Sequence, residues 1–277
     1  MKFTKMHGIG NDYVYINCFE ETVSDPKKLA IEMSNRHFGI GSDGLILIKP
    51  GKSAPFRMDM YNADGSWSEM CGNGLRCVAK YVYDRGMIRS EVFDIETGAG
   101  TLQITIFPTN GKAELIEINM GKPLLEAKKI PINEYSGRVI NQSITILDKT
   151  FRFTALSMGN PHCVIFLEED LRDFNLHKYG PIIENHPLFP NRVNVEFVNI
   201  ISSKEIIQRT WERGSGETLA CGTGASAVQV AGVLNSITER SILNHLKGGD
   251  LHLRWDDNDY VYLKGPAEFV FEGEWNK

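Results

Sequence analysis

The chain has 277 residues, 42% of them hydrophobic, so it can bury a substantial core and is long enough for two domains. Its 30 basic and 35 acidic residues give a net charge of −5 and are scattered along the chain. They form none of the Lys/Arg runs that are typical of nucleic-acid or anionic-membrane surfaces. The composition therefore excludes a disordered chain and indicates small molecules, rather than nucleic acids or membranes, as partners.

The N-terminal segment and the cysteines indicate a reducing compartment. Residues 1–17 are interrupted by polar side chains too often for a signal-peptide core, and no apolar run reaches membrane-spanning length. The cysteine number is odd and no CxxC spacing occurs, which argues against a disulfide framework and against a zinc site. We therefore expect a cytoplasmic protein with reduced thiols and no metal. The five cysteines are Cys18, Cys71, Cys77, Cys163 and Cys221.

Strands are predicted to outnumber helices. Stretches rich in β-branched or aromatic residues, which favour strands, occur at 13–17, 45–48, 56–61, 101–107, 114–119, 157–167 and 194–201, with a last one at 260–271. Helical patterns are clearest at 25–35, 72–85 and 222–234, and two of these helices begin directly after a cysteine. This mixture predicts an α+β fold.

The same pattern occurs twice along the chain. The segment around Cys221-Gly222-Thr223-Gly224 aligns with the one around Cys71-Gly72-Asn73-Gly74 at an offset of 150 residues (221 − 71). A Gly-Asn pair before an apolar strand, Gly10-Asn11 and Gly159-Asn160, repeats at an offset of 149 (160 − 11). Two independent landmarks with nearly one offset indicate a duplicated domain rather than a solenoid.

The duplication predicts where the domains divide. A turn-like break at 121–123 separates the two halves, and the last predicted strand lies beyond the repeat. We expect that strand to return and complete the first half. The predicted domains are therefore residues 1–120 plus 263–277, and residues 121–262.

The placement of Cys71 and Cys221 before helices suggests proton-transfer chemistry. Helix N-termini carry unpaired N–H groups and a partial positive charge, so they bind carboxylates and stabilise thiolates. The adjoining glycines let a substrate approach the backbone closely. If the two halves face each other across a cleft, the two sulfurs flank one carbon, as inversion by one base and one acid requires. No lysine motif for a pyridoxal cofactor and no metal-ligand spacing is visible, so we expect no cofactor.

These residues, taken together, resemble those of the diaminopimelate epimerase family. The resemblance runs almost end to end and implies an isomerase that interconverts LL- and meso-2,6-diaminopimelate in lysine and peptidoglycan precursor biosynthesis. It also implies two pseudo-symmetric domains, each a mostly antiparallel curved sheet around a central helix, with the active site in the cleft between them. The matching segments are 6–12, 61–66, 69–74, 157–162, 194–197, 212–214 and 217–225.

The resemblance assigns a role to each site residue. Cys71 and Cys221 are the acid/base pair, His162 and Glu212 lie near the reacting amino group and the thiols, and Asn11 helps to orient them. The reacting carboxylate is held by backbone amides of Gly72, Asn73, Gly222 and Thr223. The far amino-acid end of the substrate is bound by Asn62, Asn160, Asn194 and Arg213.

One position departs from the family pattern, and two alternatives remain. Many members carry Gln where this chain has Gly44, so a substrate hydrogen bond from that side chain is absent or supplied elsewhere. A proline or hydroxyproline racemase shares the two-thiol logic, but Arg213 and the asparagines at the far end disfavour it. A non-catalytic amino-acid-binding protein would need neither cysteine. A homodimer stays open, since no motif indicates one.

Overall fold

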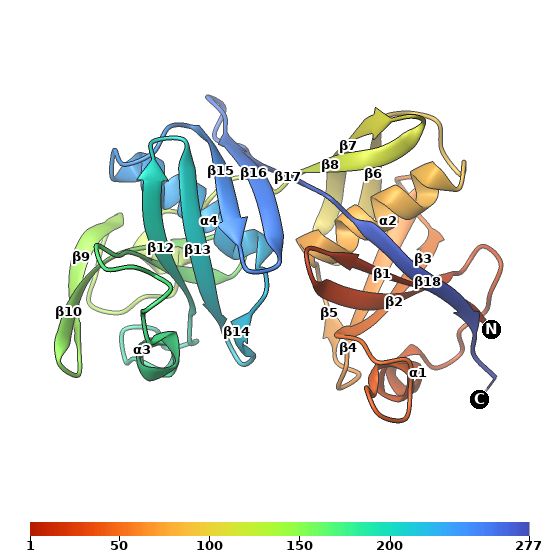
Figure 1. Cartoon of the computed structure of the whole chain (residues 1–277), viewed down its shortest axis with the longest axis horizontal. Coiled ribbons are helices and arrows are strands. Elements are labelled where there is room, and N and C mark those ends of the chain that lie inside the picture. The colour runs from red at the N-terminus through yellow and green to blue at the C-terminus, as the bar shows by residue number, and fades with distance from the viewer. Residues whose placement is uncertain (277) are drawn as a thin grey trace. The chain divides into compact units, whose positions relative to one another are not determined.

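The computed structural model describes residues 1–276 and divides the chain into two compact units (Figure 1). Unit 1 consists of Met1–Asn119 together with the C-terminal segment from Lys264, and unit 2 is Met120–Leu263. In the part of the chain that the structure describes, none of the helices combines the length and apolar character that a bilayer crossing requires. Each unit has its own strands, helices and buried core.

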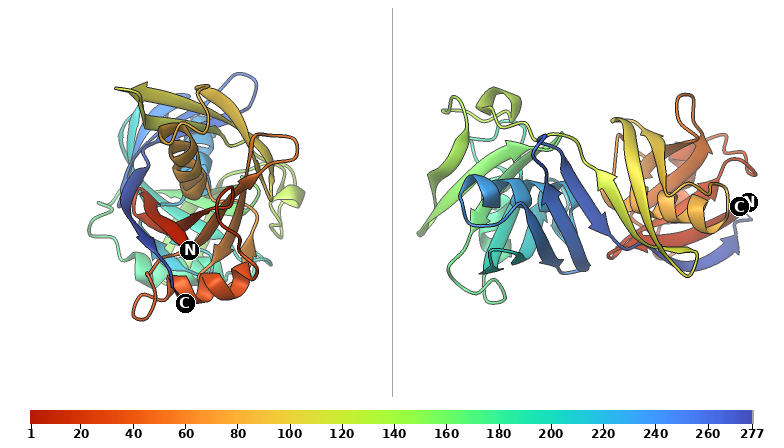
Figure 2. Two further views of the ribbon diagram at one scale, coloured as in Figure 1. Left: turned by 90° about the vertical axis from the view of Figure 1, so that its right-hand side faces the viewer. Right: turned by 90° about the horizontal axis from the view of Figure 1, so that it is seen from above.

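Unit 1 is built around the helix α2 (Gly72–Asp84), which is buried along almost its whole length. The left view of Figure 2 shows α2 inside the ring of strands, and its contacts are with β1, β2, β7 and β8. A second helix, α1 (Pro26–Ser34), begins with the Asp25 side chain as its cap. The strands are β1 (Lys2–Gly8), β2 (Asn11–Asn17), β3 (Gly44–Pro50), β4 (Phe56–Asn62), β5 (Trp67–Ser68), β6 (Val92–Thr97), β7 (Gly100–Thr109), β8 (Lys112–Asn119) and β18 (Glu268–Glu274).

Unit 2 repeats this plan around α4 (Gly222–Leu234), which packs on β10, β11, β12, β15 and β16. It also contains α3 (Leu176–Glu184) and a short 3₁₀ helix, Ala127–Lys129. The strands are β9 (Val139–Ile146), β10 (Lys149–Ser157), β11 (Pro161–Phe166), β12 (Asn194–Ser202), β13 (Glu205–Glu212), β14 (Gly216–Thr218), β15 (Ser241–Leu246), β16 (Gly249–Trp255) and β17 (Val261–Gly265). The last two residues of β17 belong to unit 1.

Strand pairing is the same in the two units. The pairs β1–β2, β3–β4 and β6–β7 are antiparallel, as are β10–β11, β12–β13 and β15–β16. The pairs β2–β3 and β4–β6 are parallel, as are β11–β12 and β13–β15. The last strand, β18, joins β1 as β9 joins β10, so the end of the chain completes unit 1. The α+β class with two similar halves is thus confirmed.

The shared register gives each position of unit 1 a counterpart in unit 2. Tyr13 lies beside Gly44 in the β2–β3 pair, and His162 lies beside Asn194 in the β11–β12 pair. Two residues further along β3 and β12 stand Ile46 and Glu196.

Some sequence-based boundaries were wrong. The predicted strand 157–167 is interrupted, because β10 ends at Ser157 and a turn with Gly159 at φ +97° reverses the chain into β11. The predicted strand 260–271 is two strands, β17 and β18, separated by Pro266-Ala267. The helix α3 was missed because it contains Gly180 and Pro181, which disfavour helices.

Candidate active site

Cys71 caps α2 with its side chain. Its backbone is extended (φ −142°, ψ 115°), and Sγ accepts the N–H of Gly74 at 3.4 Å. The same sulfur donates to Asn11 Oδ1 at 3.3 Å. The structure therefore brings Asn11 to Cys71, and the half-buried thiol lies at the start of a helix as the sequence predicted.

The amide of Asn11 is held in one orientation. Its Nδ2 donates to Asp43 Oδ2 at 2.7 Å, which leaves Oδ1 facing the sulfur. Asn73 Nδ2 donates to the same Oδ1 at 3.4 Å, and the Arg36 guanidinium binds the other oxygen of Asp43 at 2.9 Å. The orientation of Asn11 thus depends on Asp43, which the sequence reading did not single out.

Tyr13 is a further neighbour of Cys71 that sequence reasoning missed. Its hydroxyl lies within hydrogen-bonding reach of Asn11 and Cys71, and burial, followed by the neighbouring Cys71, raises the pKa of Tyr13 well above its usual range. The repeat could have indicated Tyr13, because the offset of 149 (162 − 13) aligns Tyr13 with His162 in the second half.

Cys221 caps α4 in the same way as Cys71 caps α2. Its Sγ accepts the N–H of Gly224 at 3.3 Å and lies 3.4 Å from Thr223 Oγ1. Burial, Glu212 and Glu196 raise the pKa of the Cys221 thiol well above its usual range, although the Thr223 hydroxyl and the Gly224 N–H act in the opposite direction. The sequence indicated that a helix start stabilises a thiolate, and that one cysteine of the pair acts as base and the other as acid. For Cys221 burial outweighs the helix terminus.

A chain of hydrogen bonds leads from Cys221 into the core of unit 2. Asn160 Nδ2 donates to Thr223 Oγ1 at 3.2 Å, and Asn160 Oδ1 lies 2.9 Å from His162 Nε2. His162 Nδ1 lies 2.8 Å from Glu196 Oε1, and both of these side chains are fully buried. The structure thereby joins Asn160, His162 and Thr223 to Cys221. It adds Glu196, whose signal in the sequence was a charge inside the apolar run of β12.

The remaining predicted residues of unit 2 organise the turns around β12 and β13. Asn194 Oδ1 accepts the backbone N–H of Arg213 at 3.0 Å, and its Nδ2 donates to the Pro161 carbonyl at 3.0 Å. The Arg213 guanidinium donates to the Asn191 carbonyl at 3.0 Å. Glu212 Oε1 accepts the Thr218 hydroxyl at 2.6 Å, and its charge acts on Cys221.

Asn62 and Gly44 lie side by side where β3 and β4 pair. Asn62 Nδ2 donates to Ser66 Oγ at 2.9 Å, within the turn after β4. A Cβ atom at Gly44 would lie 2.2 Å from the Tyr61 carbonyl oxygen and 3.0 Å from the Tyr13 ring. With this backbone, the position where the family often has Gln cannot hold a side chain.

Cys77 and Cys163 are both buried. Burial raises the pKa of Cys77 to about 12 and raises that of Cys163 as well, so both thiols are unreactive structural residues. Among residues 1–276, no group of three or more His, Cys, Asp or Glu side chains is arranged to hold a metal ion.

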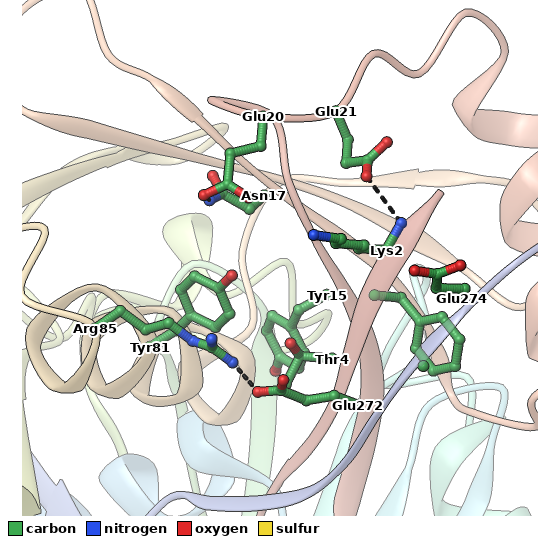
Figure 3. A pocket seen from close by; sticks show the side chains of 12 residues that line it. Lys2, Thr4, Tyr15, Asn17, Glu20, Glu21, Tyr81, Arg85, Glu272 and Glu274 are labelled. Atoms are coloured by element: carbon green, nitrogen blue, oxygen red, sulfur yellow. Dashed lines mark hydrogen bonds and ion pairs between the residues drawn. The ribbon is translucent and has the colours of Figure 1, made fainter.

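A polar pocket of about 410 Å³ lies at the other end of α2, where Tyr81 and Arg85 line it (Figure 3). Arg85 forms an ion pair with Glu272, and Glu21 accepts the backbone N–H of Lys2 at 2.9 Å. The pocket contains none of the predicted site residues.

Comparison with known proteins identifies close relatives. The family model described as diaminopimelate epimerase matches residues 3–126 and 154–270. A protein named diaminopimelate epimerase from Acetivibrio thermocellus is 52% identical over 275 residues, which cover 99% of this chain and 98% of that one. One of the same name from Brachyspira hyodysenteriae is 54% identical with the same coverage of both chains.

Solved structures share the fold at low identity. A hydroxyproline epimerase from Agrobacterium vitis has a TM-score of 0.70 and 15% identity, over 99% of this chain and 90% of that one. A phenazine biosynthesis protein of the PhzF family from Bacillus anthracis has a TM-score of 0.68 and 14% identity, over 100% and 99%. These two likenesses concern the fold alone.

Proposed function

Because the chain belongs to the diaminopimelate epimerase family, we propose that it interconverts LL- and meso-2,6-diaminopimelate by proton transfer at the α-carbon, with Cys71 and Cys221 as the acid/base pair and without a cofactor. The observation that carries this proposal is the matched pair of helix-capping cysteines. Each sulfur accepts an N–H three residues ahead, and each begins the buried helix of its unit. A fold that needed only packing would not place a thiol at both helix starts.

The helix starts also suit the substrate's reacting carboxylate. The first N–H groups of a helix have no intrahelical partners and carry partial positive charge. The backbone amides of Gly72, Asn73, Gly222 and Thr223 would bind the carboxylate, as the family resemblance implies. They would also stabilise the negative charge that develops on the substrate when the α-proton leaves.

The environments of the two thiols suggest how the roles are divided. The raised pKa of Cys221 keeps this thiol protonated near neutral pH, so it is suited to deliver a proton. Inversion needs one thiolate at the start of each turnover. We infer that Cys71, which is less buried, is that thiolate when the substrate arrives, and that its hydrogen bond to Asn11 Oδ1 is lost when the Cys71 thiol ionises.

The distal end of the substrate is assigned by the chemistry of the side chains. An ammonium-carboxylate end needs amide oxygens, amide N–H groups and a guanidinium, and Arg213 can bind a carboxylate through two parallel hydrogen bonds. Arg213 would fill this role with Asn62, Asn160 and Asn194, and His162 and Glu212 would serve the reacting amino group. A substrate of the proline or hydroxyproline type has no second amino-acid end and would leave these groups without a partner.

Two further proposals concern the state of the protein in the cell. We place it in the cytoplasm, because two catalytic thiols need a reducing compartment. We also propose a homodimer through β18, where Val270 and Phe271 are 52% and 47% exposed on a strand at the surface of unit 1. Light scattering of the purified chain tests the dimer, and a monomeric mass at micromolar concentration would exclude it.

Incubation with LL-diaminopimelate in deuterated water tests the reaction. The proposal predicts formation of the meso isomer with deuterium at one α-carbon. Proline and hydroxyproline serve as parallel substrates. Racemisation of either, without turnover of diaminopimelate, would reject the assignment.

A further inference from the structure

Glu196 is a buried carboxylate that has no role in the reaction proposed above. It is fully buried on β12, its Oε1 is paired with His162, and its Oε2 has no hydrogen-bond partner among the described residues. Burying an ionisable group that is only partly satisfied is costly, and apolar replacements of buried ion pairs are often neutral or stabilising. Its presence therefore calls for a reason other than stability.

The duplication of the chain provides an internal comparison. Ile46 occupies on β3 the register position that Glu196 occupies on β12, and Tyr13 occupies the position of His162. A Cβ atom at Gly74 would lie 2.5 Å from Ile46 Cδ1, and one at Gly224 would lie 2.6 Å from Glu196 Oε1. The same space beside the capping cysteine is thus filled by a methyl group in unit 1 and by a carboxylate in unit 2. The architecture does not require a charge there.

The hydrogen-bonding groups around His162 fix where its protons lie. Nε2 faces the acceptor oxygen of Asn160 at 2.9 Å, so this nitrogen carries a proton. Nδ1 faces a carboxylate oxygen of Glu196 at 2.8 Å, so a second proton must lie between these two atoms. With its oxygen committed to His162, the Asn160 amide presents its N–H to the Thr223 hydroxyl, which adjoins the Cys221 sulfur.

We propose that Glu196 is a positioning residue for Cys221, which it controls by fixing His162, Asn160 and the Thr223 hydroxyl and by placing a carboxylate beside the thiol. This role rests on the proposed epimerase function. It makes the two halves unequal, since the position of Glu196 in unit 1 is apolar. Glu196 acts on Cys221 through these groups.

The electrostatic surroundings of Cys221 agree with this geometry. After burial and Glu212, Glu196 is the next cause that raises the pKa of Cys221. A Cβ atom built on Gly224 would lie 2.6 Å from Glu196 Oε1 and 3.3 Å from Cys221 Sγ, so both groups border the same space. Removing the carboxylate should therefore ease ionisation of Cys221.

Two variants separate positioning from packing. Glu196→Gln keeps the shape and can donate an N–H to His162 Nδ1, whereas the double variant His162→Tyr with Glu196→Ile gives unit 2 the pair that unit 1 has. Glu96→Gln is the matched control, because Glu96 is a buried carboxylate of unit 1 that binds backbone N–H groups of residues 52–54. For all three variants, the measurements are the thermal midpoint, and kcat and KM for LL-diaminopimelate. Alkylation of each cysteine by iodoacetamide is also followed across pH by mass spectrometry.

The proposal predicts that Glu196→Gln and the double variant melt at or above the wild-type temperature while kcat falls by between about 10- and 100-fold. In Glu196→Gln the midpoint of Cys221 alkylation moves to lower pH and that of Cys71 stays in place. Glu96→Gln lowers the melting temperature and leaves kcat and both alkylation midpoints unchanged. An unchanged Cys221 midpoint, or a loss of kcat that parallels a loss of thermal stability, would overturn the inference. Alkylation needs no turnover, so an inactive wild type would reject the epimerase function and still leave this test valid.

Discussion

The sulfurs of Cys71 and Cys221 each accept the N–H of the glycine three residues ahead, at 3.4 and 3.3 Å, yet their other neighbours differ. Cys71 faces the amide oxygen of Asn11, whereas Cys221 faces the hydroxyl of Thr223. The shared capping explains why both thiols lie at helix starts. The different neighbours explain why their ionisation should differ.

Replacing Thr223 by Val removes the hydroxyl that favours ionisation of Cys221. A single neutral hydrogen bond is worth about 1 kcal/mol, so the pKa of Cys221 should rise and kcat should fall. The pH dependence of Cys221 alkylation measures the shift, with Cys71 in the same sample as the control. A shift to lower pH would show that the hydroxyl does not stabilise the thiolate. Thr223→Val and Glu196→Gln should move the midpoint in opposite directions.

Replacing Asn11 by Ala removes the amide that links Asp43 to the Cys71 sulfur. We expect kcat to fall by between about 10- and 100-fold, because the thiol loses its orienting partner. The free energy of unfolding should fall by only about 1 kcal/mol, since Asp43 keeps Arg36 as a partner. Asn17→Ala, which removes an amide bonded to Glu20 near the surface, is the control and should retain full activity. Equal kcat in the two variants would contradict the role of Asn11.

Stability should decline at alkaline pH because of buried thiols. Burial raises the pKa values of Cys77, to about 12, and of Cys163 and Cys221. An unfolded thiol ionises at about pH 8.5, so above that pH the unfolded chain binds fewer protons than the folded one. The contribution of each buried thiol to the free energy of unfolding is fully present below about pH 8.5. It is lost as the pH rises toward the pKa of the folded state, by up to about 1.4 kcal/mol per pH unit for each thiol.

Urea unfolding between about pH 8 and 10 measures this decline. The variant Cys77→Ala should be less stable throughout, because it leaves a cavity, but its stability should fall less steeply with pH. Parallel pH profiles for Cys77→Ala and the wild type would contradict the assignment of a raised pKa to Cys77.

Placing at position 44 the Gln that is frequent in the family should destabilise this chain. A Cβ there would lie 2.2 Å from the Tyr61 carbonyl, so Gly44→Gln should lower the free energy of unfolding by about 1 to 3 kcal/mol. Gly137→Asn is the control, since that glycine has open space around it and φ of +69°, which Asn tolerates. Equal stability of both variants would mean that β3 and β4 adjust easily to a side chain at position 44.

The sequence allowed prediction of the features that are local and repeated. A cysteine before Gly-x-Gly at a helix start needs only neighbouring residues, and its recurrence at an offset of 150 (221 − 71) indicated the duplicated fold. Glu196 and Tyr13 were missed because their importance depends on pairing between strands that are distant in sequence. The Gly159-Asn160 pair was recognised as preceding a strand, but the predicted strand still began at Ser157 because apolar and β-branched residues lie on both sides of the pair.

The rest of the site could be predicted only in part. Asn160, His162 and Thr223 were assigned from the family resemblance, and their hydrogen-bonded order toward Cys221 became visible only in the structure. The sequence required one base and one acid but left open which cysteine is which, because burial of a side chain is a tertiary property. For Cys221 that burial reverses the direction of the pKa shift.

The most direct test of the two-thiol mechanism is the rate of epimerisation of LL-diaminopimelate by Cys71→Ala and Cys221→Ala, with Cys18→Ala as the control outside the site. Each site variant should lose between about 100- and 10,000-fold in kcat, as expected when a general acid or base is removed, while Cys18→Ala keeps wild-type activity. All three should remain folded by circular dichroism. Near-normal turnover by either site variant would contradict the account.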